Sequence, residues 1–332
     1  MDGKSNLFGL RAVSRRQRLP GCFPWQDCLF RVCYRDPVIP RRHDTDRFSR
    51  AVGTRVVGAT LIAGRGYTQS RRMILRLADG RTVFAKQATD EITADWLRAE
   101  HRAYSQLRGS FVAELIGWDD DGGPSPVLVL EDLSGSRWPP PWQPGMVDSV
   151  LATLAEVAAH PVLDGLARVS DLSYMDGNWA EVAADPQPLL GLGMCSAAWL
   201  ERALPVLLDA AELHLYGGTA LLHLDVRSDN MCFPPGRTVL FDWNLAAVGN
   251  PEFDVAFWLP SLALEGGPRP DEVAAVSPGV AGLVAGFFAS RAGLPLIPQA
   301  PLVRDIQRKQ LAVALPWAAR TLDLPPPIPV VS

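Results

Sequence analysis

Length, composition and charge set the first limits on the protein. Its 332 residues, 48% of them hydrophobic, can build one large domain or two ordinary ones with a sizeable core. Residues 1–50 hold 11 of the 32 Lys and Arg residues but 5 of the 36 Asp and Glu residues, so the rest of the chain carries 21 basic against 31 acidic residues. An acidic body argues against nucleic acid as a partner and is compatible with a cationic small molecule.

Cysteines and apolar runs exclude further classes. The five cysteines show no Cys-x-x-Cys or Cys/His metal spacing, which indicates a reducing compartment without disulfides or structural zinc. No apolar run approaches the roughly 20 residues that cross a bilayer, and the N-terminus lacks the hydrophobic centre of a signal peptide. We therefore expect a cytoplasmic protein with no membrane partner, and the sequence leaves its oligomeric state open.

The first 50 residues differ in texture from the rest. Neither helical nor strand periodicity runs through them, and four prolines interrupt the segment. We predict a disordered basic leader over residues 1–50, with a targeting or anion-binding arm, or an over-extended start of translation, as the alternatives.

Residues 51–132 alternate between short apolar runs and turns. A Gly/Ser-containing loop and Asp79-Gly80, a strong hairpin signal, separate the first three runs and predict an antiparallel meander. A helix is predicted over residues 90–107, where Ile92, Trp96, Ala99, Ala103 and Leu107 recur at helical spacing. The predicted strands lie in residues 54–64, 71–79, 81–89, 111–119 and 126–133.

Residues 133–324 are predicted to be mainly helical. The proline-rich stretch SRWPPPWQPG, residues 136–145, separates this part from the preceding strands. Apolar periodicity predicts helices near residues 145–159, 196–216, 278–291 and 302–322. A tight turn, PPGRT, joins two short predicted strands, Met231–Phe233 and Val239–Phe241. We expect residues 325–332 to be a flexible tail.

One segment places many polar groups between apolar runs: LLHLDVRSDNMCFPPGRTVLFDWNLA, residues 221–246. Four residues separate Asp225 from Asn230, and Asp242 follows the second short strand. A loop closed by a hairpin can bring these three side chains to one point. One carboxylate can then accept a proton from an attacking hydroxyl, while an amide oxygen and a second carboxylate hold Mg²⁺, which prefers oxygen ligands. Such equipment suits phosphoryl transfer, where positioning and charge neutralisation dominate.

The same segment resembles the aminoglycoside phosphotransferase and choline kinase-like family, a relative of the protein kinases. HLDVRSDN matches the family's H-x-D-x-x-x-x-N loop, and FDW matches its metal-binding Asp motif. The resemblance implies Asp225 as the catalytic base and Asn230 and Asp242 as Mg²⁺ ligands. NLAAVGNPEFDVAFW is similar to the segment that follows in the family, where Asp254 would be a buried structural anchor. His223 is expected to pack and hydrogen-bond the loop rather than transfer protons.

This resemblance implies an α+β fold with the bilobal protein kinase-like architecture. A small antiparallel-sheet lobe with one helix, residues 51–132, would bind the nucleotide. A larger, mainly helical lobe, residues 133–324, would carry the catalytic loop and the substrate. The resemblance covers roughly residues 54–322 and is weakest between residues 160 and 195.

Lys86 is one of only three lysines in the chain, and it shares a strand face with Phe84 and Ala88. If that face looks inward, the ammonium needs an anionic partner. The resemblance supplies two: the α/β-phosphates of a nucleotide, and Glu100 of the next helix. Without the catalytic loop, Lys86 and Glu100 would read as an ordinary surface ion pair.

Two more segments of the small lobe have counterparts in the family. AGRGYTQS, residues 63–70, with Gly64 and Gly66, would be the hairpin that covers the phosphates, although glycine is common in any hairpin. LEDL, residues 130–133, would be the hinge between the lobes. Its backbone at Glu131 and Leu133 would meet the adenine edge.

The sequence thus predicts a phosphotransferase that uses ATP and Mg²⁺, with GTP as the alternative donor, and acts on a hydroxyl of a small molecule. Leu224 stands where antibiotic kinases often have glycine, which weakens an assignment to aminoglycosides. Trp138, Trp142 and Trp179 fall in irregular segments where a substrate could stack.

A catalytically weak nucleotide-binding regulatory protein is the alternative function. It is disfavoured because Lys86, Asp225, Asn230 and Asp242 are all present. Protein kinase activity is disfavoured too, since no Ala-Pro-Glu-like motif follows Asp242.

Overall fold

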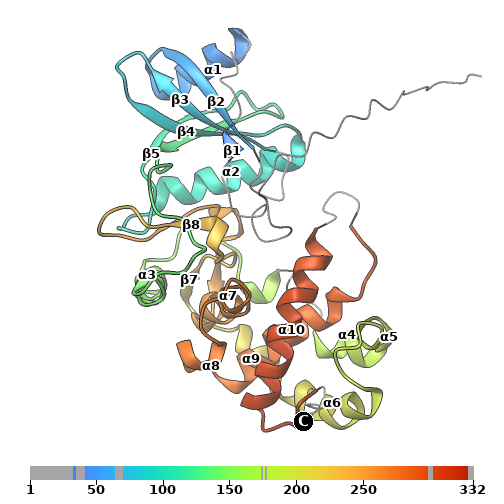
Figure 1. Cartoon of the computed structure of the whole chain (residues 1–332). Helices are drawn as coiled ribbons and strands as arrows, with labels where there is room; N and C mark the ends of the chain where they lie inside the picture. Colours follow the sequence, from blue (N-terminus) through green and yellow to red (C-terminus); the bar gives the residue numbers. More distant parts are fainter. Residues whose placement is uncertain are drawn as a thin grey trace, which may run out of the picture.

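The computed structural model describes residues 33–34, 42–63, 70–172, 175, 178–297 and 302–327. A twisted sheet with two helices forms one part, and a larger, mainly helical part lies below it (Figure 1). We name the described residues up to Glu131 the small lobe and those after it the large lobe. The predicted α+β fold, with a small antiparallel-sheet lobe and a larger, mainly helical lobe, is confirmed, whereas the predicted domain boundary at residues 132 and 133 stays a prediction.

The small-lobe sheet has the order β1-β2-β3-β4-β6-β5, with every pair antiparallel. The predicted meander is β2–β3–β4, and Gly80 at its second turn has a φ of 88°, which glycine adopts without strain. A short β1 extends the five predicted strands. The strands are β1 (Cys33–Tyr34), β2 (Val56–Ala63), β3 (Arg71–Leu77), β4 (Thr82–Gln87), β5 (Leu115–Asp119) and β6 (Val127–Glu131).

Helix α2 (Glu91–Gln106) begins where predicted, but its buried face differs from the prediction. Asp90 caps it, since the Asp90 carboxylate accepts the N–H of Thr93 at 2.8 Å. Of the residues at the predicted apolar spacing, Ile92 and Trp96 are 64% and 44% exposed, whereas Ala103 and Leu107 are buried. The buried face of the helix also contains polar residues, which apolar spacing does not mark; its members are Thr93, Ala94, Leu97, Glu100, Ala103 and Tyr104.

Helix α1 (Arg42–Val52) corrects the predicted leader, whose end at residue 50 is wrong. Phe48 is 1% exposed, and it packs with Leu75 and Val129 against the face of the sheet opposite α2. Arg47 Nε donates to Asp119 Oδ2 of β5 at 2.7 Å. The helix therefore belongs to the folded small lobe; of the predicted leader, residues 1–32 and 35–41 lie outside the described residues.

Four predicted large-lobe helices are present as α3, α6, α9 and α10, although α6 ends at Ala210, short of the predicted residue 216, and α7 follows the catalytic segment. The helices are α3 (Met146–Ala159), α4 (Trp179–Ala184), α5 (Gln187–Leu190), α6 (Ala197–Ala210), α7 (Glu252–Leu264), α8 (Pro270–Val273), α9 (Pro278–Ala292) and α10 (Val303–Thr321). The 3-10 turns are η1 (Val169–Asp171), η3 (Leu213–Tyr216), η4 (Ser228–Asn230) and η5 (Trp243–Leu245). Two antiparallel pairs use β7 (Ala220–Leu222) with β10 (Ala247–Gly249), and β8 (Met231–Cys232) with β9 (Val239–Leu240).

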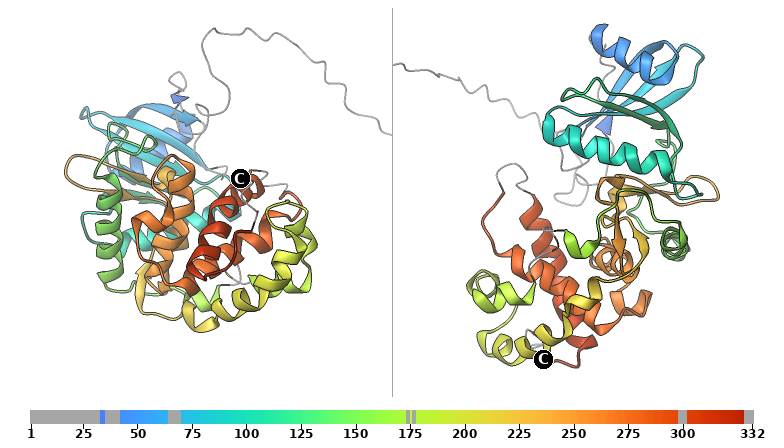
Figure 2. Two further views of the ribbon diagram at one scale, coloured as in Figure 1. Left: turned by 60° about the horizontal axis from the view of Figure 1, so that its bottom comes forward. Right: turned by 180° about the vertical axis from the view of Figure 1, so that it is seen from behind.

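One apolar core joins the two lobes. The inner side of α2 and the helices of the large lobe contribute to the same cluster of buried side chains, with α2 lying directly above the catalytic segment (Figure 2). Buried apolar surface of this extent stabilises the fold and fixes α2 against η5. Consequently the elements that carry the predicted site are rigidly related to each other.

Part of the predicted flexible tail, residues 325–332, is described by the structure. Residues 328–332 of the predicted flexible tail lie outside the described residues, whereas Pro325 is held: its carbonyl accepts the indole N–H of Trp199 at 2.7 Å. Within the described ranges, no helix combines the length and the apolar character needed to cross a membrane.

Candidate functional site

A cleft of about 530 Å³ lies between the lobes. Strand β4, helix α2, the β6 end and the catalytic segment all contribute side chains to it. Every predicted site residue that the structure describes lines this one cleft: Lys86, Glu100, Glu131, Leu133, Asp225, Asn230 and Asp242. Gly64 and Gly66 lie outside the described residues.

The catalytic loop, residues 223–230, runs from β7 to η4 and is anchored by α7. Asp254, in the first turn of α7, accepts the backbone N–H groups of His223 and Leu224, both at 2.7 Å. Leu224 has a φ of 59°, a left-handed backbone conformation that costs residues other than glycine about 1–2 kcal/mol. The two hydrogen bonds stabilise that conformation, so Asp254 is the buried anchor expected from the sequence.

His223 has a structural position inside this loop. Its ring is fully buried; the Asp225 N–H donates to Nδ1 at 3.2 Å, and Nε2 lies 2.6 Å from the Phe241 carbonyl oxygen. A neutral ring with its proton on Nε2 satisfies both contacts. Burial lowers the pKa of His223, which favours that neutral form. The residue packs and orients the loop, as predicted.

Asp225 is held on both carboxylate oxygens while it faces the cleft. The Asn230 amide Nδ2 donates to Asp225 Oδ2 at 2.8 Å, and Arg227 Nε lies 3.3 Å from Oδ1. The same Arg227 nitrogen lies 3.2 Å from Asp229 Oδ1. The side chain of Asp225 is 28% exposed, so a proton donor in the cleft can still reach its carboxylate.

Lys86 joins two carboxylates from different lobes. Its Nζ donates to Glu100 Oε2 at 2.7 Å and also contacts Asp242 Oδ1. Lys86 is 8% exposed and Glu100 is 2% exposed, so an ordinary surface ion pair is ruled out. Asp242 precedes η5 with a φ of 60°, another left-handed residue, and Asn244 and Leu245 of that turn also line the cleft.

The charge states of this triad follow from burial and mutual attraction. Burial lowers the pKa of Lys86, but Asp242 and Glu100 outweigh it and raise that pKa above its ordinary value. Burial raises the pKa of Asp242, but Lys86 and Arg72 outweigh it and lower that pKa. For Glu100 burial prevails and raises the pKa, because one ammonium is shared between two carboxylates.

Asn230 and Asp242 offer oxygen donors for a divalent cation. Because Asn230 Nδ2 donates to Asp225, the Asn230 amide oxygen is the atom left to accept or coordinate. Throughout the described ranges, no group of three or more His, Cys, Asp and Glu side chains is arranged to hold a metal. The donors that these two residues offer, an amide oxygen and a carboxylate, are of the kind that a hard cation such as Mg²⁺ prefers.

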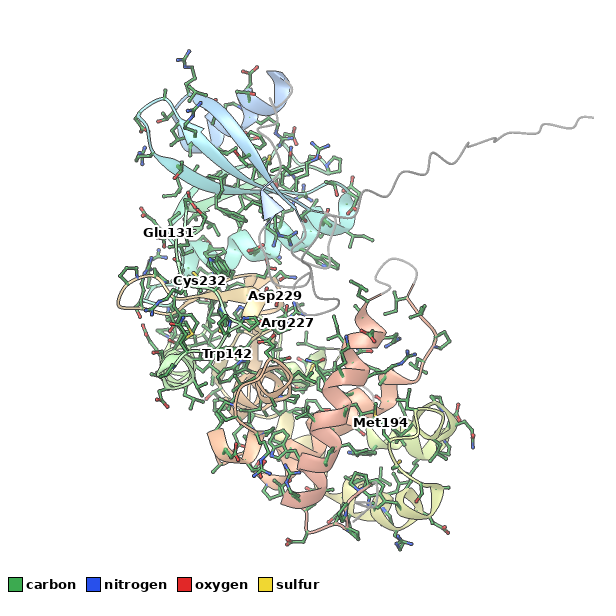
Figure 3. All side chains as sticks on the ribbon, viewed as in Figure 1. Glu131, Trp142, Met194, Arg227, Asp229 and Cys232 are labelled. Atoms are coloured by element: carbon green, nitrogen blue, oxygen red, sulfur yellow. The ribbon has the colours of Figure 1, made fainter. Side chains whose placement is uncertain are left out.

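The hinge residue Glu131 connects the lobes through its side chain. Its Oε1 accepts Arg237 Nη2 at 2.6 Å and the Glu114 N–H at 2.9 Å. Arg237, in the β8–β9 turn, also donates to the Val112 carbonyl at 3.1 Å. The sequence indicated only the Glu131 backbone, and Figure 3 shows its side chain at the junction of the lobes.

Sequence reasoning missed several charged residues at or near the cleft, among them Arg72 of β3, which lines it. Arg227 and Asp229 lie within the HLDVRSDN motif itself, and Figure 3 shows them close together beneath the small lobe. Arg237 and Glu265 come from distant segments with no motif to mark them. The position of Arg227 between the proposed base and the proposed metal ligand was the one available signal.

The tryptophans proposed for substrate stacking are differently placed. Trp179 is fully buried and donates its indole N–H to the Gly282 carbonyl at 2.8 Å, so it cannot meet a substrate. Trp138 lines the cleft and stacks on Phe241, with ring centroids 5.5 Å apart. Trp142 packs against Trp258 of α7 at 5.6 Å between ring centroids.

Two solved structures are among those to which the fold of this chain is similar. A candidate aminoglycoside phosphotransferase from Ralstonia eutropha JMP134 has 14% identity and a TM-score of 0.52, over 84% of this chain and 98% of that chain. Aminoglycoside phosphotransferase APH(4)-Ia, solved as a thermostable mutant with AMP-PNP and hygromycin B, has 15% identity and a TM-score of 0.49, over 85% and 97% of the two chains.

A search of curated protein sequences gives no match. The phosphotransferase enzyme family, in contrast, matches residues 63–285, a span that includes Lys86, the catalytic loop and α7. This span is more than half of the chain and contains every described residue of the predicted site. The chain therefore belongs to the phosphotransferase enzyme family.

Proposed function

We propose that the protein transfers the γ-phosphoryl group of ATP, with Mg²⁺, to a hydroxyl of a small molecule. The observation that carries this proposal is the meeting of Lys86, Asp225, Asn230 and Asp242 in one cleft between the lobes. GTP is the alternative donor, since nothing in the described cleft separates the two bases. We also propose a cytoplasmic location, on the composition of the sequence.

The small-lobe side of the cleft suits a nucleotide. The Lys86 ammonium, held by Glu100, supplies positive charge for the α/β-phosphates. Phe84, Leu130 and Leu133 line the same cleft and offer apolar contacts for a base. The backbone at Glu131 and Leu133 is then the proposed partner of the adenine edge.

The large-lobe side suits the chemical step. Asp225 orients the acceptor hydroxyl and takes its proton while the hydroxyl oxygen forms a bond to the γ-phosphorus. The bond from that phosphorus to the bridging oxygen breaks, and ADP leaves with the electron pair. Asn230 and Arg227 keep the Asp225 carboxylate in place. Mg²⁺, when bound at Asn230 and Asp242, neutralises phosphate charge.

The acceptor class is proposed from charge. Residues 51–332 carry 21 basic against 31 acidic residues, which favours a cationic small molecule over nucleic acid. Asp229 adds a carboxylate to the cleft beside Arg227. No membrane partner is proposed.

A regulatory protein that binds nucleotide without turnover is the second candidate. The intact set of Lys86, Asp225, Asn230 and Asp242 supports the enzyme. Turnover with an acceptor decides between them, so a panel of hydroxylated small molecules, read by ATP and GTP consumption, is the direct experiment. Consumption that depends on an acceptor supports the enzyme, and tight nucleotide binding without any consumption supports the regulator.

Metal binding gives an independent test. Asp242→Ala should abolish the tightening of ATP binding by Mg²⁺, while circular dichroism shows an intact fold. Asp209→Ala, at an exposed position of α6, is the matched control and should keep the Mg²⁺ effect. If Asp242→Ala retains the full Mg²⁺ dependence, Asp242 is not a metal ligand.

A further inference from the structure

Glu265 is a carboxylate that the proposed chemistry does not use but that contacts the catalytic loop. It is the residue directly after the end of α7. Its Oε1 accepts the Ser228 hydroxyl at 2.6 Å, and its Oε2 accepts the Trp142 indole N–H at 3.0 Å. Both carboxylate oxygens are therefore engaged by neutral donors from two different segments.

Ser228 begins the short turn of the catalytic loop that carries Asn230. It is 1% exposed, and this turn, η4, ends at Asn230. The Asn230 N–H donates to the Arg227 carbonyl at 3.0 Å, which closes this turn, and the Asn230 side chain holds Asp225. A displacement of Ser228 would thus pass to the proposed metal ligand and the proposed base.

Helix α7 holds the catalytic loop at both of its ends. Asp254 in its first turn binds the loop's start, and Glu265 after its last turn binds the loop's end through Ser228. Glu265 follows Asp254 by eleven residues, which corresponds to about 16 Å along a helix. Helix α7 is itself buried, so it provides a rigid reference for this distance.

The surroundings of Glu265 make its contacts specific. Trp142, which donates its indole N–H to Glu265, is itself held in place because it packs against Trp258 of α7. Arg227 and Asp229 are the charged groups that act on Glu265 from the loop side. In Figure 3, Trp142 lies below Arg227 and Asp229, on the large-lobe side of the cleft.

We propose that Glu265 is a positioning residue for phosphoryl transfer: through the Ser228 hydroxyl it fixes the turn that carries Asn230 and so the geometry of Asn230 and Asp225. This inference rests on the proposed function, because its consequence for rate requires turnover. It assigns to the end of α7 a role in the chemical step rather than in nucleotide binding. Its effect should therefore fall on kcat and leave ATP affinity measured without Mg²⁺ nearly unchanged.

A double-mutant cycle tests the proposal. Glu265→Met removes both acceptors at similar size, and Ser228→Ala removes the hydroxyl. Each should lower kcat roughly tenfold, on the scale of one lost hydrogen bond in the transition state. The double variant should be no slower than the slower single variant, because both act through the same contact. Glu265→Gln, which keeps an acceptor oxygen, should lose less than Glu265→Met.

Controls separate positioning from stability. Glu272→Gln, which removes an exposed carboxylate of α8, should leave kcat unchanged. Hydrogen exchange should show faster exchange of the catalytic-loop amides in Glu265→Met and Ser228→Ala than in wild type. Multiplicative losses in the double variant, or an unchanged kcat in Glu265→Met, would overturn the proposal. If the wild type consumes no nucleotide with any acceptor, the proposed function fails, and unchanged exchange of these amides would reject the positioning contact independently.

Discussion

Lys86 shows how a single residue constrains the site. A buried ammonium is stable here only because Glu100 and Asp242 lie against it. The sequence revealed this residue because lysine is rare in the chain and stands on an inward strand face. It could not reveal that Lys86 also contacts Asp242, since 156 residues separate the two.

Replacement of Lys86 has a predicted outcome that differs from replacement of the base. Lys86→Ala leaves Glu100 and Asp242 without their shared cation, so both nucleotide affinity and kcat should fall. Calorimetry of ATP binding and steady-state kinetics measure the two effects. Lys309→Ala, at the exposed Lys309–Asp305 pair of α10, should change neither. Unchanged ATP affinity in Lys86→Ala would remove Lys86 from the phosphate site.

Glu265 gives a prediction for pH. Burial, the largest cause, raises the pKa of Glu265 from its ordinary 4.5 to about 7 in the folded protein. The folded state therefore binds this proton more tightly than the unfolded state, and ionisation of Glu265 lowers stability as pH rises from about 4.5 to about 7. Relative to Glu265→Gln, the wild type should lose about 1–3 kcal/mol of stability between pH 5 and pH 8. Urea unfolding of both proteins across this range would contradict the shift if the two pH curves run parallel.

Among the elements, α1 and α2 show what periodicity can and cannot predict. The existence of α2 was predictable from its spacing and acidic first turn, but its buried face was not, because that face contains Thr93 and Glu100. Helix α1 was missed since few of its residues are apolar, and its contacts with β5 lie far along the chain. The long helices α3, α9 and α10 and the meander were predicted because local apolar patterns and turn signals mark them.

Stability measurements can verify both corrections. Phe48→Ala, in α1, should lower the free energy of unfolding by roughly 3–5 kcal/mol, as expected for a buried phenylalanine. Ile92→Ala, in α2, should change it by less than about 0.5 kcal/mol because the side chain is 64% exposed. Thermal or urea unfolding compares the two variants. A small loss of unfolding free energy in Phe48→Ala would mean that α1 does not pack on the small lobe. A large loss in Ile92→Ala would mean that the Ile92 side chain is buried.

The molecule as a whole joins its lobes through an apolar core and a few charged contacts. Helix α2 shares its core with the large lobe, Lys86 reaches Asp242, and Arg237 binds Glu131 at the hinge. The motif residues of the site were predictable from their order and spacing along the chain. Arg237 and Glu265 were not, because only the folded chain brings them to the hinge and the catalytic loop.

Turnover of Asp225→Asn tests the central claim, that this cleft transfers phosphoryl groups with Asp225 as the base. The substitution keeps shape and hydrogen bonding but removes the basic carboxylate. With an accepted small-molecule substrate and saturating ATP and Mg²⁺, kcat should fall by roughly 10²-fold or more, the scale of general-base catalysis. ATP affinity should change little, and Asp209→Asn, at an exposed position of α6, should behave as wild type. Full turnover by Asp225→Asn would contradict the proposed base and the assignment of the catalytic loop.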